Sequence, residues 1–186
     1  EDGLRTLLHA YASGATDADA FSRAFGRSVD EVEASFNAFV EQRYGALRDA
    51  MRTPPAQVKA DDLTGLRTRA EANPGNYISR LTYGQALIKV EDLEGARAPL
   101  ERAARLAPEA QGDGSPHALL ARIAEIQKDP ERARREYRAL LTYDHTNANA
   151  ARRWAALAAT ANAADEEHSA LRLVADLDPF DADTHT

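Results

Sequence analysis

The feature that most constrains the fold of this chain is a segment that recurs in its second half. Three copies align with one another, at residues 77–108, 114–145 and 148–179. Ala96 in the first copy falls on Ala133 in the second, 37 residues later, and Ala133 falls on Glu167 in the third, 34 residues later. The second copy therefore begins after about three extra residues. A unit of this length that repeats is typical of an array in which neighbouring copies stack on one another.

Each copy has the composition and spacing of two helices joined by a short turn. Ala, Leu, Arg and Glu dominate the chain, and apolar residues recur every three to four positions. Gly84 and Ala96 lack bulk, so the two helices of the first copy can approach closely there. Leu87 and Leu100 would fill the space beside them. We therefore expect an all-α fold in which each hairpin covers an apolar face of the next.

The aligned positions of the three copies resemble the tetratricopeptide repeat (TPR). This repeat is a helix–turn–helix with large residues at its fourth and seventh positions, small residues at positions eight, twenty and twenty-seven, and proline at position thirty-two. In the first copy the matching residues are Tyr83, Gly84, Ala96, Ala103 and Pro108. The resemblance implies a right-handed α-solenoid of TPR-like hairpins. It is weakest in the third copy, where a glutamate replaces the small residue at position twenty.

The pattern divides the chain into three parts. Residues 1–51 form a helical segment, residues 52–73 combine a proline-containing linker with a capping helix, and residues 74–186 hold about three repeats. Leu63, Leu66 and Ala70 have the spacing of a helix that faces the array. We expect this helix to cover the open end of the first hairpin.

The first part predicts three helices, over residues 1–12, over a short stretch that ends at Gly26, and over a long stretch from Ser28 to Met51. Ser28 and Glu31 have the spacing of a capping box, in which each bonds to the backbone amide of the other. The long helix carries one apolar stripe of Val29, Val32, Phe36, Phe39, Val40, Tyr44, Leu47 and Met51. We expect this stripe to be buried against another element.

Residues 3–45 resemble the helical tail of gluzincin-type metallopeptidase domains, the peptidase MA group. The resemblance lies in a helix, a short helix with "AFSRAFG" at its end, and a long helix that opens with "SVDE" and carries aromatic residues. The zinc motif H-E-x-x-H of that group does not occur in this sequence. If the parent protein is a peptidase, its zinc ligands lie upstream of residue 1.

Charge and composition disfavour several classes of function. The net charge of −7 and the pI of about 5.3 argue against a nucleic-acid partner, because phosphate binding relies on clustered Lys and Arg. No apolar run approaches the roughly 20 residues of a membrane-spanning helix. The chain has no cysteine, its five histidines are widely separated, and no nucleophile or phosphate-loop motif is present. We expect no catalytic residue, metal site or cofactor here.

The resemblance to the TPR also implies which residues face the concave groove. They are Ile78, Leu81, Gln85, Ile88 and Lys89 in the first copy, Arg122, Glu125 and Ile126 in the second, and Asn149 and Arg152 in the third. Such a groove combines apolar area with hydrogen-bond donors. It would suit a peptide or helix with some acidic character.

The leading hypothesis is a non-catalytic scaffold that binds a protein or peptide in this groove. A second hypothesis makes the chain the accessory C-terminal region of a zinc metallopeptidase, and a third makes it a structural subunit of a larger assembly. The sequence leaves the compartment open, although the peptidase resemblance slightly favours an exported protein.

Overall fold

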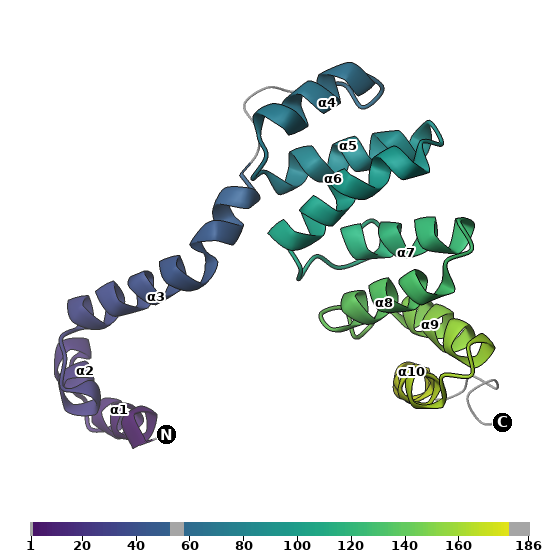
Figure 1. Cartoon of the computed structure of the whole chain (residues 1–186). Coiled ribbons are helices and arrows are strands. Elements are labelled where there is room, and N and C mark those ends of the chain that lie inside the picture. Colours follow the sequence, from purple (N-terminus) through teal and green to yellow (C-terminus); the bar gives the residue numbers. More distant parts are fainter. Residues whose placement is uncertain (1, 53–57, 179–186) are drawn as a thin grey trace. The chain divides into compact units, whose positions relative to one another are not determined.

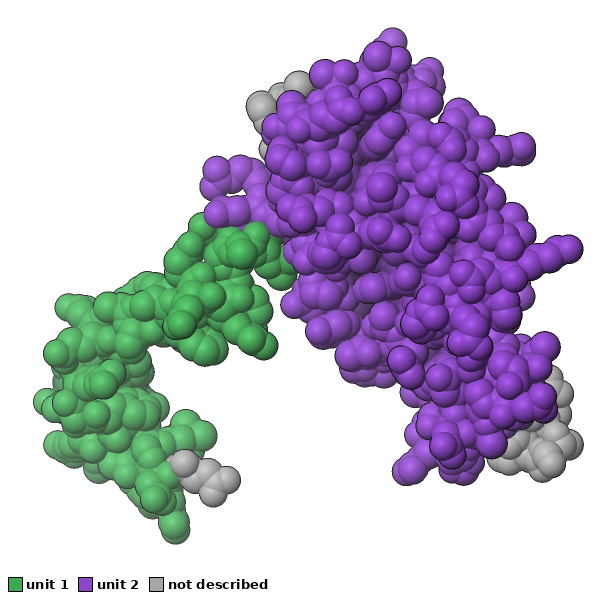
Figure 2. Space-filling view, viewed as in Figure 1, with its two compact units in different colours: residues 1–48 green, residues 49–186 purple. Residues whose placement is uncertain are grey.

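The computed structural model describes residues 2–52 and 58–178, and all its regular structure is helical (Figure 1). The chain divides after Arg48 into two compact units, which Figure 2 shows in different colours. The first unit is residues 1–48 and the second is residues 49–186. The predicted end of the third copy, Pro179, lies outside the described residues.

The first unit begins with two short helices that pack against each other, α1 (Asp2–Ala12) and α2 (Asp17–Phe25). Thr16 caps α2, since its side chain accepts a hydrogen bond from the Asp19 amide, and α2 ends at Gly26 in the left-handed conformation. The rings of Phe21 and Phe25 lie 5.6 Å apart on one face. The helix bounds predicted for this region are therefore confirmed to within a residue or two.

Helix α3 (Val29–Ala50) opens with the predicted capping box. The Ser28 amide donates to Glu31 Oε2 at 2.8 Å, and the Glu31 amide donates to Ser28 Oγ at 3.2 Å. The expected burial of the apolar stripe is wrong for the described residues. Phe36 is 60% exposed and Phe39 is 57% exposed, because neither α1 nor α2 packs along α3 within the first unit.

The second unit is a series of helices in which each packs mainly on the next along the chain (Figure 1). A single helix, α4, comes first, and three hairpins follow. The bounds are α4 Leu63–Ala72, α5 Tyr77–Lys89, α6 Leu93–Leu106, α7 Pro116–Ile126, α8 Pro130–Leu141, α9 Ala148–Thr160 and α10 Ala164–Leu177. This serial packing is that of an α-solenoid. The prediction of an all-α array of stacked hairpins is therefore confirmed.

The three hairpins turn by the same backbone motif. In each, one residue adopts a left-handed conformation between the two helices: Glu91, Lys128 and Asn162, with φ of 63°, 59° and 54°. The amide after that residue donates to a carbonyl five residues back at 2.9 Å, which is a Schellman ending of the first helix. Asp92 and Asp129 then cap the second helix, whereas Ala163 makes no side-chain cap in the third hairpin.

The small residues at the aligned repeat positions lie where the helices of a hairpin approach each other most closely. Ala96, Ala103, Ala121 and Ala133 are fully buried. A Cβ atom added to Gly84 would lie only 2.7 Å from Cγ and Cδ2 of Leu100, a side chain with 0% exposure. Glycine at this position therefore lets α5 and α6 close around Leu100.

The third hairpin closes although it lacks the small residue at position twenty. Helices α9 and α10 still pack closely, and Ala170 and Val174 of α10 are fully buried. Glu166 accepts hydrogen bonds from Trp154 Nε1 at 3.1 Å and from Arg134 at 3.2 Å, which ties α10 to α9 and α8. Trp154 is thus a packed core residue, as the sequence indicated.

The extra residues before the second copy form an anchored loop. Nine residues (107–115) join α6 to α7, whereas six (142–147) join α8 to α9. The buried Asp144 carboxylate accepts from the Gly112 amide at 2.8 Å and from Asn147 Nδ2 at 3.1 Å. Gln111 Nε2 also donates to the Tyr143 carbonyl at 2.6 Å. The longer loop is therefore held against the loop of the next repeat.

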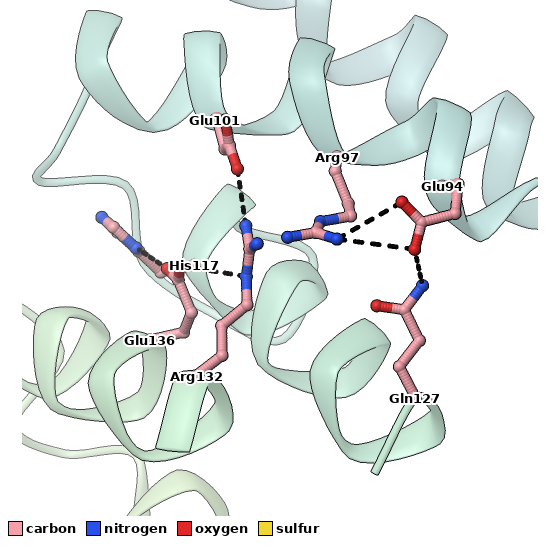
Figure 3. Close-up of polar contacts among 7 residues, drawn as sticks. All are labelled: Glu94, Arg97, Glu101, His117, Gln127, Arg132 and Glu136. Atoms are coloured by element: carbon pink, nitrogen blue, oxygen red, sulfur yellow. Dashed lines mark hydrogen bonds and ion pairs between the residues drawn. The ribbon is translucent and has the colours of Figure 1, made fainter. Parts of the chain in front are cut away.

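Polar side chains join the first and second hairpins along their edge (Figure 3). Arg132 of α8 donates to Glu101 of α6 at 2.6 Å, and Gln127 donates to Glu94 of α6 at 2.6 Å. Beside them Glu136 contacts both the His117 ring at 2.8 Å and, at 3.9 Å, Arg132. Because the Arg132 side chain is largely buried, these contacts are worth more than exposed ion pairs and fix the stacking of the two hairpins.

Replacement of Gly84 by alanine tests the close approach of α5 and α6. We expect Gly84→Ala to lower the free energy of unfolding by about 1–3 kcal/mol, because the new methyl group displaces Leu100. Gly75→Ala is the matched control, since a Cβ there meets no atom within 4 Å. Urea denaturation of both variants gives the comparison. A Gly84→Ala protein as stable as the parent would contradict the packing described.

Removal of the Asp144 carboxylate tests the loop anchor. We expect Asp144→Ala to lower the free energy of unfolding by about 1–3 kcal/mol, because the Gly112 amide loses its acceptor in a site that is only 7% exposed. Asp144→Asn, which keeps one acceptor oxygen, should lose less. Thermal unfolding followed by circular dichroism measures both changes, and an Asp144→Ala protein as stable as the parent would show that the carboxylate is not the anchor.

Candidate functional site

A hollow of about 310 Å³ lies where α7, α8 and α9 meet. One face of α7 contributes residues at i, i+4 and i+7, which are Ala118, Arg122 and Glu125, and Ile126 adjoins them. The other lining residues are Tyr137 and Leu140 from α8, Asn149, Ala150 and Arg153 from α9, and Asp113 from the preceding loop. Four of the predicted groove residues therefore come together here: Arg122, Glu125, Ile126 and Asn149.

The floor of this hollow is part of the hydrophobic core. Ala118, Tyr137, Leu140 and Ala150 are all buried, and they belong to the core cluster that joins the second and third hairpins. A ligand side chain that enters the hollow would therefore meet a packed surface whose shape is fixed by the stacking of the repeats.

The rim of the hollow is polar and mostly exposed. Arg153 Nη1 of α9 lies 3.9 Å from Glu125 Oε2 of α7, so this pair bridges the two helices. Arg122 forms no ion pair with any residue that the structure describes. Asn149 presents an exposed amide, and Ile126 an exposed apolar side chain. The rim thus offers hydrogen-bond donors beside an apolar edge.

Tyr137 connects the floor to the rim. Tyr137 is only 5% exposed, and it adjoins Glu125 in the lining of the hollow. Burial, followed by the nearby Glu125 carboxylate, raises the pKa of Tyr137 from 10.0 to about 12; Arg153 and Arg122 act in the opposite direction. The phenol therefore stays protonated at neutral pH.

A second hollow, of about 510 Å³, continues the first along α7 and α9. The two hollows share Glu125 and Arg153 in their linings. Beyond this pair the second hollow is lined by Lys128, Pro130, Ala156, Leu157 and Thr160. Together the two form a groove, which we call the α7–α9 groove, with the Glu125–Arg153 pair near its middle.

A third hollow, of about 280 Å³, lies at the first hairpin and receives three other predicted residues, Ile78, Gln85 and Lys89 of α5. The remaining lining comes from Leu66 and Arg69 of α4, from Val58 and Ala60 before it, and from Thr82 and Ala86 of α5. We call it the α4–α5 hollow. The capping helix thus takes part in forming this site.

The last three predicted residues line none of these hollows. Leu81 and Ile88 are partly buried and pack against the core cluster of the first hairpin. Arg152 of α9 donates to Asp178 at 2.8 Å, just after the end of α10. The neighbouring Arg153 reaches the groove instead, because adjacent residues of a helix point about 100° apart.

The sequence analysis missed several lining residues, among them the polar or charged side chains of Arg69, Asp113, Tyr137 and Arg153. Tyr137 had a detectable signal. It aligns with the core residue Leu100 of the first copy, and the hydroxyl of a buried tyrosine needs a polar partner. Arg69 and Arg153 gave no such signal, since their positions depend on helix orientations that the repeat pattern fixes only approximately.

The described residues contain no cluster of three or more His, Cys, Asp or Glu side chains that could hold a metal ion. Nor does any helix in residues 2–52 and 58–178 combine the length and apolar character needed to cross a membrane.

Comparison with solved structures places the fold among tetratricopeptide repeat proteins. The chain is similar to the MamA protein, with a TM-score of 0.54 and 11% identity, over 81% of this chain and 75% of that one. It is also similar to YrrB, described as a TPR protein with an unusual peptide-binding site, with a TM-score of 0.53 and 17% identity over 81% and 69% of the two chains. No protein-family model and no curated protein matches the sequence. The resemblance of residues 3–45 to a metallopeptidase tail stays a prediction.

The raised pKa of Tyr137 predicts a loss of stability in alkali. Below about pH 10 the phenol is protonated in both states; between about pH 10 and pH 12 the unfolded chain ionises while the folded chain does not. The folded state therefore loses roughly 2–3 kcal/mol relative to the unfolded state over this range. Tyr137→Phe should reduce this loss by that amount, as measured by urea denaturation at several pH values. An identical pH dependence in both proteins would contradict the burial of the phenol.

Proposed function

We propose that this chain is a non-catalytic protein-interaction module that binds a peptide segment of a partner in the α7–α9 groove. The observation that carries the proposal is the groove itself, which combines a buried floor with a polar rim. The similarity to YrrB supports it in general terms, since that protein is described as having a peptide-binding site.

The groove suits a peptide that inserts one apolar side chain. The floor of Ala118, Tyr137, Leu140 and Ala150 offers a rigid surface, and a hollow of about 310 Å³ has room for one apolar side chain of a peptide. Exposed Asn149 can donate to and accept from a peptide backbone beside the hollow. An extended segment would thus gain both apolar contact and hydrogen bonds.

The charges of the rim favour an acidic residue next to the inserted side chain. Arg153 is already paired with Glu125. Arg122 has no carboxylate partner among the described residues, and its guanidinium can bind a carboxylate of the ligand in bidentate geometry. Arg122 would therefore contribute more to peptide affinity than Arg153.

A peptide displayed on phage and selected against the full chain provides the test. We expect Arg122→Glu to weaken binding of a selected peptide by tenfold or more, because it replaces a charge-assisted hydrogen bond by repulsion between like charges. Isothermal titration calorimetry measures the dissociation constant. The far-ultraviolet circular dichroism spectrum should be unchanged, since Arg122 is exposed.

Arg135→Glu is the matched control, because Arg135 is an exposed arginine of α8 that lines none of the three hollows. It should bind the selected peptide as the parent does. Equal weakening in both variants would show a general effect of charge. Unchanged affinity in Arg122→Glu would remove the α7–α9 groove as the binding site.

A further inference from the structure

The α4–α5 hollow differs from the α7–α9 groove in its charges. Its lining contains two cationic side chains, Arg69 and Lys89, and no aspartate or glutamate. Its remaining surface is mostly apolar, from Leu66, Ile78 and Ala86 among others. A hollow of this composition can accept an anionic group of a ligand next to an apolar group of the same ligand.

Arg69 is held in a position that leaves its charge without a counter-ion. Its Nη2 donates to Thr82 Oγ1 at 2.6 Å, while the Thr82 hydroxyl itself donates to the Ile78 carbonyl at 2.8 Å. The Nε atom of Arg69 is buried and has no hydrogen-bond partner. The side chain therefore bonds to one neutral hydroxyl and to no carboxylate among the described residues. A partly buried charge without a counter-ion is less favourable than one paired with an anion.

Lys89 is the second cation in the lining of the hollow. Ile78, Thr82, Gln85 and Lys89 lie at i, i+4, i+7 and i+11 of α5, so they form one face of that helix. Lys89 is exposed and pairs with none of the described carboxylates. Its flexible stem can reach an anion above the hollow, whereas Arg69 is fixed by Thr82.

Several other arginines of the same array contact carboxylates. Arg132 contacts Glu101, Arg134 contacts Glu166, and Arg67, only two residues before Arg69, contacts Glu71. The lining of the α4–α5 hollow, in contrast, holds two cations and no carboxylate, in a chain whose net charge is −7. In such an acidic protein, an uncompensated cationic hollow indicates a site for a ligand that supplies the negative charge.

We propose that the α4–α5 hollow binds an acidic side chain of a peptide, with the apolar side chain that follows it packed on Leu66, Ile78 and Ala86. Arg69 and Lys89 hold the carboxylate between them. The proposal rests on the proposed function as a peptide-binding array. It concerns a different hollow, however, whose lining shares no residue with that of the α7–α9 groove.

Two blocked hexapeptides provide the probe, both acetylated at the N-terminus and amidated at the C-terminus. One has glutamate followed by leucine at its centre, and the other has glutamine in place of the glutamate. Each is titrated into the full chain, labelled with nitrogen-15, to millimolar concentration. We expect the glutamate peptide to shift the amide signals of residues 78–89 and to bind about tenfold more tightly than the glutamine peptide, since a charge-assisted bond is lost in the second.

Three variants separate a binding role from a structural one. Arg69→Gln and Lys89→Gln should each weaken binding of the glutamate peptide by about fivefold or more. Arg135→Gln, which removes an exposed charge outside the hollow, should bind it unchanged. Arg69→Gln should also leave the melting temperature unchanged or raised, because it removes an unmatched charge that is partly buried.

Four results would overturn the proposal. Equal affinity for the glutamate and glutamine peptides would show that no carboxylate is recognised. If N-acetyl-leucine, whose only carboxylate is terminal, bound more tightly than the glutamate peptide, the site would be assigned to a chain terminus instead. A lower melting temperature of Arg69→Gln, with unchanged affinity, would make Arg69 structural. Shifts confined to α7 and α9 would place the peptide in the α7–α9 groove, so failure here is distinguishable from failure of that groove.

Discussion

The close approach of the two helices within each hairpin is the contact on which the rest of the array depends. Gly84 and the fully buried alanines Ala96, Ala121 and Ala133 allow it, since a larger side chain would hold the helices apart. A closed hairpin still leaves one apolar face open, and the next hairpin covers it. The identical Schellman turns then fix the direction in which each second helix returns.

The α7–α9 groove is a consequence of this stacking. Tyr137 packs in the core between the second and third hairpins and lines the groove beside Glu125, which pairs with Arg153 at the rim. One side chain thus couples the stability of the array to the shape of the groove. The α4–α5 hollow arises in the same way at the capping helix, where Thr82 fixes Arg69.

The sequence predicted most of the array because its signals are local. Small residues at fixed offsets and the longer loop before the second copy can both be identified without knowing the orientation of any helix. The groove was predicted less fully. Arg153 rather than Arg152 lines it, because a difference of one residue turns a side chain by about 100°. Burial of the apolar stripe of α3 could not be predicted, because helical periodicity does not show which element, if any, packs against that face.

The central claim is that the α7–α9 groove holds a peptide, and a crystal structure of the full chain with a selected peptide tests it most directly. The account predicts that an apolar side chain of the peptide lies on Tyr137 and Leu140 and that an acidic residue contacts Arg122. A peptide bound on the exposed stripe of α3, or on the outer surfaces of α6 and α8, would contradict it.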